Sequence, residues 1–436
     1  MSSYSDYVLS ASSSMMDVVL SSASSASSTA ATVAGQVACS VSGVCQGVAS
    51  SAQQKLLSYK YDARPLTCED KPDYPETDSP VWMLGQQYSA RYDLAELREL
   101  VTSRPWLSYR KEFPAIGESG LTSDQGWGCM LRCGQMVLAG ALLDIKLGRE
   151  WRWSKESKEK EYFKVMEKFM DIKSAQYSIH QISLMGESLD KKPVGTWFGP
   201  NTVAQVLRKL CKFDPSNDIA VHVAMDNTLI ISEVKQACTI DTTEDNDEDD
   251  KSEEKVKTYN WQPLLLFISL RLGLNEINPV YIPGLKTCLT LPCTLGVIGG
   301  SPNHALYLLG YVEDEVIYLD PHTTQPAAPP AKSVEDDMTY HAVKPGRIDI
   351  SQLDPSLSLC FLCTTEEEFD NLCIAMQEQL IEKCRTPLFE MLLERPPHMY
   401  SQLTHGDINV QPDESTGMDY EQLNRKYDSE DEFEIL

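Results

Sequence analysis

The sequence lacks the defining features of three broad classes of protein. Lys and Arg are few: 38 of them face 64 Asp and Glu, so the 436-residue chain has a formal net charge of −26. Proteins that track nucleic-acid phosphates need clustered basic side chains, and this charge excludes such a role. No apolar run approaches the roughly 20 residues that span a bilayer. The 42% apolar share excludes a wholly disordered chain.

Residues 1–54 lack Lys and Arg altogether and are about half Ser and Ala. Secretory signals need a basic region before an apolar core, and mitochondrial leaders are rich in Arg, so the segment fits neither. It predicts a disordered tail over 1–65, with a marginal Ala/Val helix as the alternative. Thirteen cysteines without a regular framework favour reduced thiols. We therefore expect a cytoplasmic protein.

The acidity is concentrated in two stretches. Asp241–Glu254 holds nine acids and one base, and Asp413–Leu436 holds nine acids and two bases. Runs of like charge without apolar residues are typical of solvated segments. We expect a mobile insertion at 241–256 and an acidic C-terminal tail over 406–436. One globular catalytic domain is then predicted over 66–405.

Apolar periodicity predicts helices in the first part of that domain and strands mainly in the second. No internal repeat is visible. The order predicts an α+β fold with an antiparallel sheet. The expected helices are 95–102, 130–147, 155–171, 202–210 and 366–381, and the expected strands are 81–84, 219–225, 264–271, 306–311, 316–319 and 358–363.

Cys129 is the sharpest candidate for chemistry, because Gly126-Trp-Gly-Cys129 marks a loop that turns into a helix. Glycines permit a tight entry, and the first turn of a helix stabilises a thiolate through its free N–H groups and dipole. That is what a cysteine nucleophile needs. A buried structural thiol is the alternative. Cys133 lies further inside the helix, so Cys129 is favoured.

Two histidines could serve as its base. His322 follows Leu319-Asp320-Pro321, where Asp320 could hold the tautomer of the imidazole as the third member of a triad. His304 opens the strand expected over 306–311, so Cys129, His304 and Asp320 form a rival triad. The pattern alone does not separate the two.

Weaker patterns favour structural roles. Cys360 and Cys363 have zinc-like spacing but lie in an apolar strand with no second pair nearby. Gly299-Gly300 lacks the Lys-Ser/Thr of a phosphate loop. No metal or cofactor is expected.

Several blocks resemble the autophagins, the papain-like cysteine proteases of autophagy. The resemblance runs from about Pro80 to Glu394 and resumes at Asp428–Leu436. Its blocks include Trp106-Leu-Ser-Tyr109-Arg-Lys, Gly126-Trp-Gly-Cys129-Met-Leu-Arg-Cys-Gly-Gln-Met136, Trp197-Phe-Gly-Pro-Asn-Thr-Val-Ala-Gln-Val-Leu207, Leu295-Gly-Val-Ile-Gly-Gly300 and Tyr318-Leu-Asp-Pro-His-Thr-Thr-Gln-Pro326. A papain-like fold with a small auxiliary subdomain and disordered tails is therefore expected.

The resemblance also implies roles for individual residues. Cys129 matches the family nucleophile, His322 its general base, Asp320 the orienting acid, and Tyr109 a residue near the oxyanion. The active site would be gated by a covering tryptophan and a regulatory loop, here Trp197 with Gly299, Gly300, Ser301, Pro302 and Asn303. His304 and Ser301 depart from the family pattern, and the Ser/Ala tail is not shared.

The implied activity is cleavage after the C-terminal glycine of GABARAP-type ubiquitin-like modifiers. It would act on their precursors and remove phosphatidylethanolamine from the lipidated form. The protein would be a monomer that contacts autophagic membranes only through this lipidated substrate. The alternative is a catalytically silent, modifier-binding adaptor on the same fold.

The C-terminus resembles a docking motif in which an acidic peptide adds a strand to the modifier's sheet. Phe433 and Leu436 have aromatic-x-x-aliphatic spacing and follow the acidic run Asp428–Glu432. A solvated acidic tail is the alternative.

Overall fold

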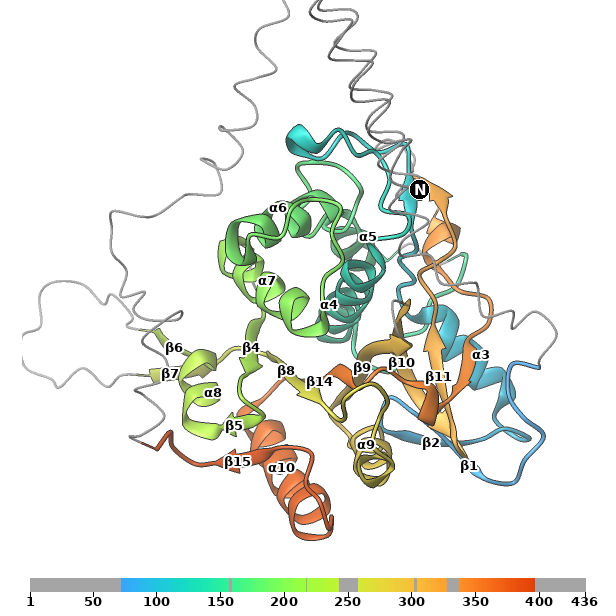
Figure 1. Ribbon diagram of the computed structural model, residues 1–436, viewed down its shortest axis with the longest axis vertical. Helices are drawn as coiled ribbons and strands as arrows, with labels where there is room; N and C mark the ends of the chain where they lie inside the picture. The colour runs from blue at the N-terminus through green and yellow to red at the C-terminus, as the bar shows by residue number, and fades with distance from the viewer. Residues whose placement is uncertain are drawn as a thin grey trace, which may run out of the picture. The chain divides into compact units, whose positions relative to one another are not determined.

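A large β-sheet with helices on both faces forms the centre of the computed structural model (Figure 1). The structure describes residues 72–156, 159–216, 218–242, 258–301, 304–327 and 337–396. All of them belong to one unit, Leu57–Leu436. In this part of the chain no helix is both long and apolar enough to cross a membrane.

The main sheet has the strand order β13-β11-β10-β9-β14-β8-β4, and β1 pairs with β10 and with β2. Its strands are β1 Pro80–Met83, β2 Gln86–Ser89, β4 Ala220–Ala224, β8 Leu264–Arg271, β9 Thr294–Ser301, β10 His304–Val312, β11 Glu315–Leu319, β13 Gly346–Asp349 and β14 Ser356–Cys363. All pairs are antiparallel except β4 with β8.

Short strands form three further pairs outside the main sheet: β3 Arg110–Lys111 with β12 Gln325–Pro326, β5 Thr228–Ile230 with β15 Glu390–Leu392, and β6 Thr239–Thr242 with β7 Thr258–Trp261. The helices are α3 Leu94–Ser103, α4 Cys129–Leu147, α5 Lys160–Glu167, α6 Ile179–Asp190, α7 Pro200–Phe213, α8 Ile231–Cys238, α9 Ile282–Cys288 and α10 Glu366–Met376. A π-helical turn, Gln377–Glu382, continues α10.

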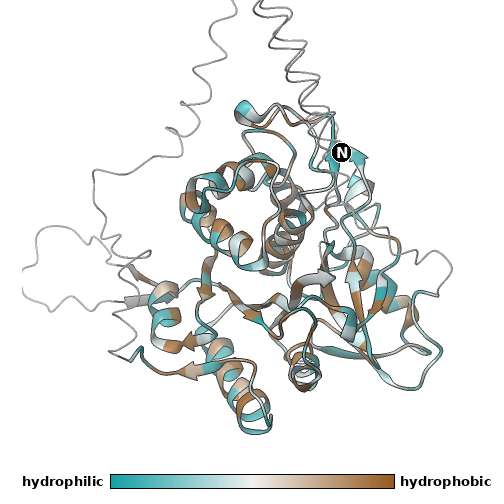
Figure 2. Cartoon of the chain, viewed as in Figure 1, coloured by the Kyte–Doolittle hydropathy of each residue, from teal (hydrophilic) through white to brown (hydrophobic). Residues whose placement is uncertain are grey.

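Helices α4 to α7 lie on one side of the sheet, and α8, α9 and α10 lie on the other (Figure 1). Each side has its own apolar core. Strands β8 and β14 are apolar along nearly their whole length because both of their faces are covered, as Figure 2 shows in brown.

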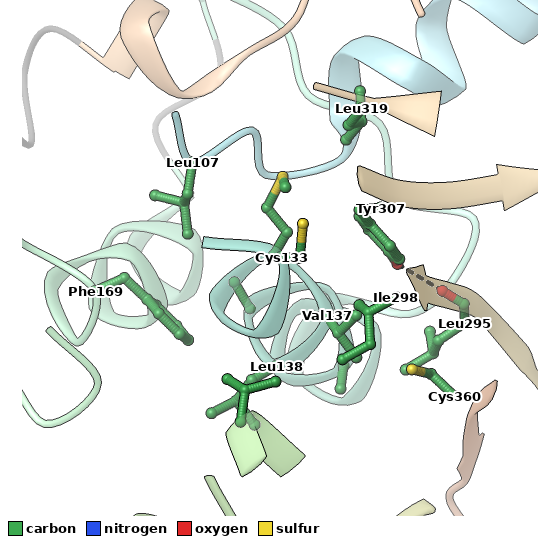
Figure 3. Packing of buried hydrophobic residues seen from close by; sticks show 14 of the residues in the cluster. Leu107, Cys133, Val137, Leu138, Phe169, Leu295, Ile298, Tyr307, Leu319 and Cys360 are labelled. Carbon is green, nitrogen blue, oxygen red and sulfur yellow. Dashed lines mark hydrogen bonds between the residues drawn. The ribbon is translucent and has the colours of Figure 1, made fainter. Parts of the chain in front are cut away.

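Helix α4 is the centre of the first core. It is buried from Cys129 to Asp144. Leu295 and Ile298 of β9 and Tyr307 of β10 lie on the side of α4 from which Val137 projects (Figure 3). The Tyr307 hydroxyl donates to the Leu295 carbonyl at 2.6 Å, which satisfies the polar end of a fully buried ring. This packing holds α4 against β9 and β10.

The predicted α+β class is confirmed, and so are most of the predicted elements. The main sheet is antiparallel as expected except at one edge, where β4 joins β8 in parallel. The helix expected over 155–171 is shorter, since the chain leaves α5 at Lys168. Helices α6, α8 and α9 and strand β9 were missed; Pro283 and Gly284 inside α9, and the glycines of β9, hid their patterns.

Candidate active site

Cys129 is the first residue of α4, and only 1% of its surface is exposed. Gly126 takes a φ of +83° in the turn before it, a left-handed conformation that favours glycine. Gly128 precedes the helix and offers no side chain to cap it. The free N–H groups and the positive dipole end of α4 are therefore available to a thiolate at Cys129.

A buried ion network that the sequence reasoning missed holds this end of α4. Arg132 donates from Nε to Asp124 and from Nη1 to Asp171, each at 2.8 Å, and all three side chains are almost fully buried. Burial opposes the charge on Arg132, but the two carboxylates raise the pKa of its guanidinium. The N–H of Gly128 donates to the Asp124 carbonyl at 2.8 Å. An Arg on the apolar face of a helix was the available signal.

Asp320 and His322 come directly after β11 and point to one another. The Nδ1 atom of His322 lies 2.5 Å from Oδ1 of Asp320, and the His322 N–H donates to the same oxygen at 2.9 Å. Trp106 donates from its indole N–H to the Asp320 carbonyl at 2.7 Å. Trp106 thus holds Asp320 in place, and the Asp320 carboxylate orients the His322 ring with Nδ1 toward itself.

His322 and Cys129 also interact electrostatically, which brings together residues from the start of α4 and the end of β11. Burial favours the neutral imidazole, but Asp320 and Cys129 raise the pKa of His322 to about 9. Burial likewise favours the thiol, yet His322 lowers the pKa of Cys129. Burial works against the Asp320 carboxylate too, and the neighbouring His304 and His322 hold its pKa below the usual range. The environment thus favours a thiolate–imidazolium pair.

Tyr109 completes the immediate surroundings of the sulfur. It is fully buried, its hydroxyl helps to lower the pKa of Cys129, and its ring meets the His322 ring edge-on, with centroids 5.2 Å apart and an angle of 83°. Its N–H donates to the Pro321 carbonyl at 2.7 Å. The N–H of Ala305 in β10 also approaches the Cys129 sulfur. The Tyr109 hydroxyl and the Ala305 N–H therefore lie beside the Cys129 sulfur, where charge changes during attack on a carbonyl.

His304, the rival histidine, lies beside His322 and is stacked on it. The two rings are 3.4 Å apart between centroids and 8° from parallel. Donor atoms of His304, Asp320 and His322 come within 4.8 Å of one another, the separation that a metal site requires. Parallel stacked rings direct their in-plane lone pairs side by side rather than at one point, which does not suit tetrahedral zinc.

The other cysteines singled out in the sequence have structural surroundings. Burial raises the pKa of Cys133 well above its usual value, which makes it a poor nucleophile. Cys360 packs in the core on the α4 side of the sheet and Cys363 in the core on the other side. Two thiols on opposite faces of one strand cannot share a zinc ion, so the zinc alternative is excluded.

The expected gating residues are only partly described. Trp197 precedes α7, is half-buried and packs against the α4-side core. Gly299, Gly300 and Ser301 are the end of strand β9, hydrogen-bonded to β10, rather than part of a loop. Pro302 and Asn303 lie outside the described residues, as do the docking residues Phe433 and Leu436.

Comparisons with known proteins agree with this geometry. Residues 94–375 match the peptidase C54 catalytic domain. The cysteine protease ATG4B of Xenopus laevis is 46% identical over 389 residues, which cover 86% of this chain and 99% of that protein. The ATG4B of Gallus gallus is 46% identical over 383 residues, 84% of this chain and 95% of its own. Human ATG4A is 39% identical over 397 residues, 88% of this chain and 99% of its own.

Proposed function

The chain belongs to the peptidase C54 family of cysteine proteases, and we propose that Cys129 is its nucleophile, His322 its general acid and base, and Asp320 the residue that orients His322. The observation that carries the proposal is the contact chain from the Cys129 sulfur to His322 and on to Asp320, 2.5 Å from the ring. It begins at a helix N-terminus, where a thiolate is stabilised.

Hydrolysis then takes two steps. The Cys129 thiolate attacks the substrate carbonyl carbon, and the His322 imidazolium gives its proton to the leaving amine as the bond to carbon breaks. Water next attacks the thioester while neutral His322 takes its proton, which releases the acid and restores the thiolate–imidazolium pair. One water is consumed. Tyr109 and the Ala305 N–H, which contact the sulfur, stabilise the oxyanion as charge moves from sulfur to oxygen.

The proposed substrates are GABARAP-type ubiquitin-like modifiers, cleaved after their C-terminal glycine. The leaving group is the peptide tail of the precursor or the phosphatidylethanolamine of the lipidated form; both leave as an amine. Family membership and the buried position of Cys129, 1% exposed, support this choice. A nucleophile so enclosed suits a narrow acyl group, and glycine has no side chain. Trp197 and the segment 299–303 would cover the entrance.

The proposed setting is the cytoplasm, where the protein acts as a monomer and meets autophagic membranes through the lipidated substrate. The acidic tail would dock the modifier through Phe433 and Leu436. Deleting the last four residues should weaken binding of the modifier, measured by calorimetry, while Cys129 chemistry toward a short peptide stays unchanged. Equal affinity with and without these residues would contradict docking.

The catalytic proposal is tested with Cys129→Ser and a purified modifier precursor. Cleavage, followed by electrophoresis, should be abolished, because a hydroxyl is a poor nucleophile without a stronger base. Cys133→Ser is the matched control in the same helix and should cleave at the wild-type rate. Undiminished cleavage by Cys129→Ser would refute the assignment. A wild-type protein that binds the precursor without cleaving it would favour the silent adaptor.

A further inference from the structure

His304 is a buried histidine that the proposed mechanism does not use. It begins strand β10, and only 1% of its surface is exposed. Among the residues that the structure describes, neither of its ring nitrogens has a hydrogen-bond partner. Buried polar groups normally have partners, because leaving one unpaired costs stability. The position of His304 beside the site therefore calls for an explanation.

The ring of His304 lies flat on the ring of His322. A centroid separation of 3.4 Å and an angle of 8° describe stacking at van der Waals contact, closer than the usual 4.5–7 Å range of aromatic pairs. Tyr109 meets the same His322 ring edge-on. Three residues thus contact the His322 imidazole. His304 lies on its face, Tyr109 meets it nearly at a right angle, and Asp320 lies at Nδ1.

The two histidines also face one carboxylate. Nδ1 of His322 lies 2.5 Å from Oδ1 of Asp320, whereas Nε2 of His304 lies 3.8 Å from Oδ2. The longer distance exceeds that of a hydrogen bond, so stacking is the closer of the contacts of His304. The charged groups that surround the pair are Asp320 and the Cys129 thiolate.

We propose that His304 is a positioning residue, whose ring holds the His322 imidazole in the orientation that reaches the Cys129 sulfur. This inference rests on the proposed catalytic role of His322. His322 is joined to the chain through a rotatable side chain, and Asp320 fixes Nδ1 but leaves the tilt of the ring about that contact free. A flat ring against its face removes that freedom, and orientation of a catalytic group is a direct contribution to rate.

Three substitutions separate stacking from polarity. His304→Phe keeps a flat ring and removes the nitrogens, whereas His304→Gln keeps a long polar group and removes the ring, and His304→Ser removes the ring and leaves only a small hydroxyl. The same three substitutions at His222, in β4, are the controls. Turnover of the modifier precursor gives kcat and KM separately. The ultraviolet absorbance of the Cys129 thiolate, taken as the difference from Cys129→Ser, is titrated against pH without any substrate.

We expect His304→Gln and His304→Ser to lower kcat about three- to tenfold with KM unchanged, the effect of losing one aromatic contact. Their thiolate signal should also appear at higher pH, because a mobile His322 stabilises it less. His304→Phe should retain more than half of the wild-type kcat. Wild-type behaviour of both ringless variants, or a His304→Phe variant as slow as they are, would overturn the proposal.

The thiolate titration keeps this test independent of the proposed substrate. If the wild-type protein cleaves no modifier precursor, the proposed function fails, yet the titration still reports whether His304 supports the Cys129–His322 pair. Far-ultraviolet circular dichroism checks the fold of each variant. If His304→Ser does not fold, His304→Gln and His304→Phe decide the question.

Discussion

Asp124 occupies the space that a side chain on Gly128 would need: a Cβ at Gly128 would lie 2.6 Å from the Cβ of Asp124. Asp124 also accepts hydrogen bonds from Arg132 and from the N–H of Arg110, at 2.7–3.1 Å. The absence of a side chain just before Cys129 thus lets a buried carboxylate hold the start of α4. This relationship connects the stability of the helix with the position of the proposed nucleophile.

Gly128→Ala should therefore destabilise the protein and disturb Cys129. The new methyl group must displace Asp124, and we expect a loss of about 1–3 kcal/mol in the free energy of unfolding, measured with urea. The kcat for precursor cleavage should fall as well. Gly140→Ala is the control in the same helix, since its nearest contact is Arg104 Nη1 at 3.6 Å. It should be neutral or slightly stabilising; equal effects at both positions would contradict the argument.

Arg132→Met should be among the more damaging substitutions in α4. It leaves the buried carboxylates of Asp124 and Asp171 without their cation, and breaking a buried pair in this way costs about 3–5 kcal/mol. Urea unfolding measures the loss. The exposed pair Arg91–Asp78 supplies the comparison, and Arg91→Met should change stability by less than about 1 kcal/mol. An Arg132→Met protein as stable as Arg91→Met would disprove the network's role.

The pH dependence of cleavage should follow the Cys129–His322 pair. Because the pKa of His322 is raised to about 9, its imidazolium is present below that value and is lost above it. We expect kcat to fall as the pH rises through about 9, when no proton remains for the leaving amine. The contribution of this group to stability is fully present below pH 6.5 and is lost over the same upper range. A flat rate from pH 8 to about 10 would contradict this assignment.

Asp320→Asn should lower kcat about 10²–10⁴-fold, since an amide neither supports the imidazolium nor keeps the Nδ1–H tautomer. The fall of kcat at high pH should move to lower pH, because the carboxylate that raises the pKa of His322 is gone. Asp337→Asn is a fitting control: this carboxylate lies beside a different histidine, with Oδ2 3.7 Å from Nε2 of His341. Its kcat profile should match the wild type. Identical profiles for both variants would exclude the proposed role of Asp320.

Gly300→Ala should impair the hairpin of β9 and β10. Gly300 has a φ of +138°, and a Cβ there would lie 2.9 Å from the Ala305 Cα, whose N–H approaches the Cys129 sulfur. Gly148 separates the two causes, because it has a φ of +86° with no atom within 4 Å of the added Cβ. We expect about 1–2 kcal/mol lost at Gly148, from backbone strain alone, and more at Gly300. Only Gly300→Ala should lower kcat.

Local sequence patterns predicted many of the helices and strands. Strand β8 was predicted with its observed bounds, and the predicted helix starting near Cys129 differs by one residue from α4. Apolar periodicity worked there because these elements are buried along their length. Apolar periodicity failed at α9, because Pro283 and Gly284 are residues that usually interrupt a helix. Pro283 lies in the first turn of α9, where a helix tolerates proline. Periodicity also failed at β9, where Gly296 and Gly300 allow close approach to β10 and Gly299 allows close approach to β14.

The sequence by itself determined the chemistry-bearing units: a cysteine where loop becomes helix, and an Asp-Pro-His segment that ends a strand. Both depend on neighbours along the chain, so local rules reveal them. Only the tertiary structure decided that His322 reaches the Cys129 sulfur while His304 stacks behind it, and that Asp124 and Asp171 share Arg132. Those contacts join segments distant in sequence, and they arise from the packing of α4 against β9 and β10, which no local pattern encodes.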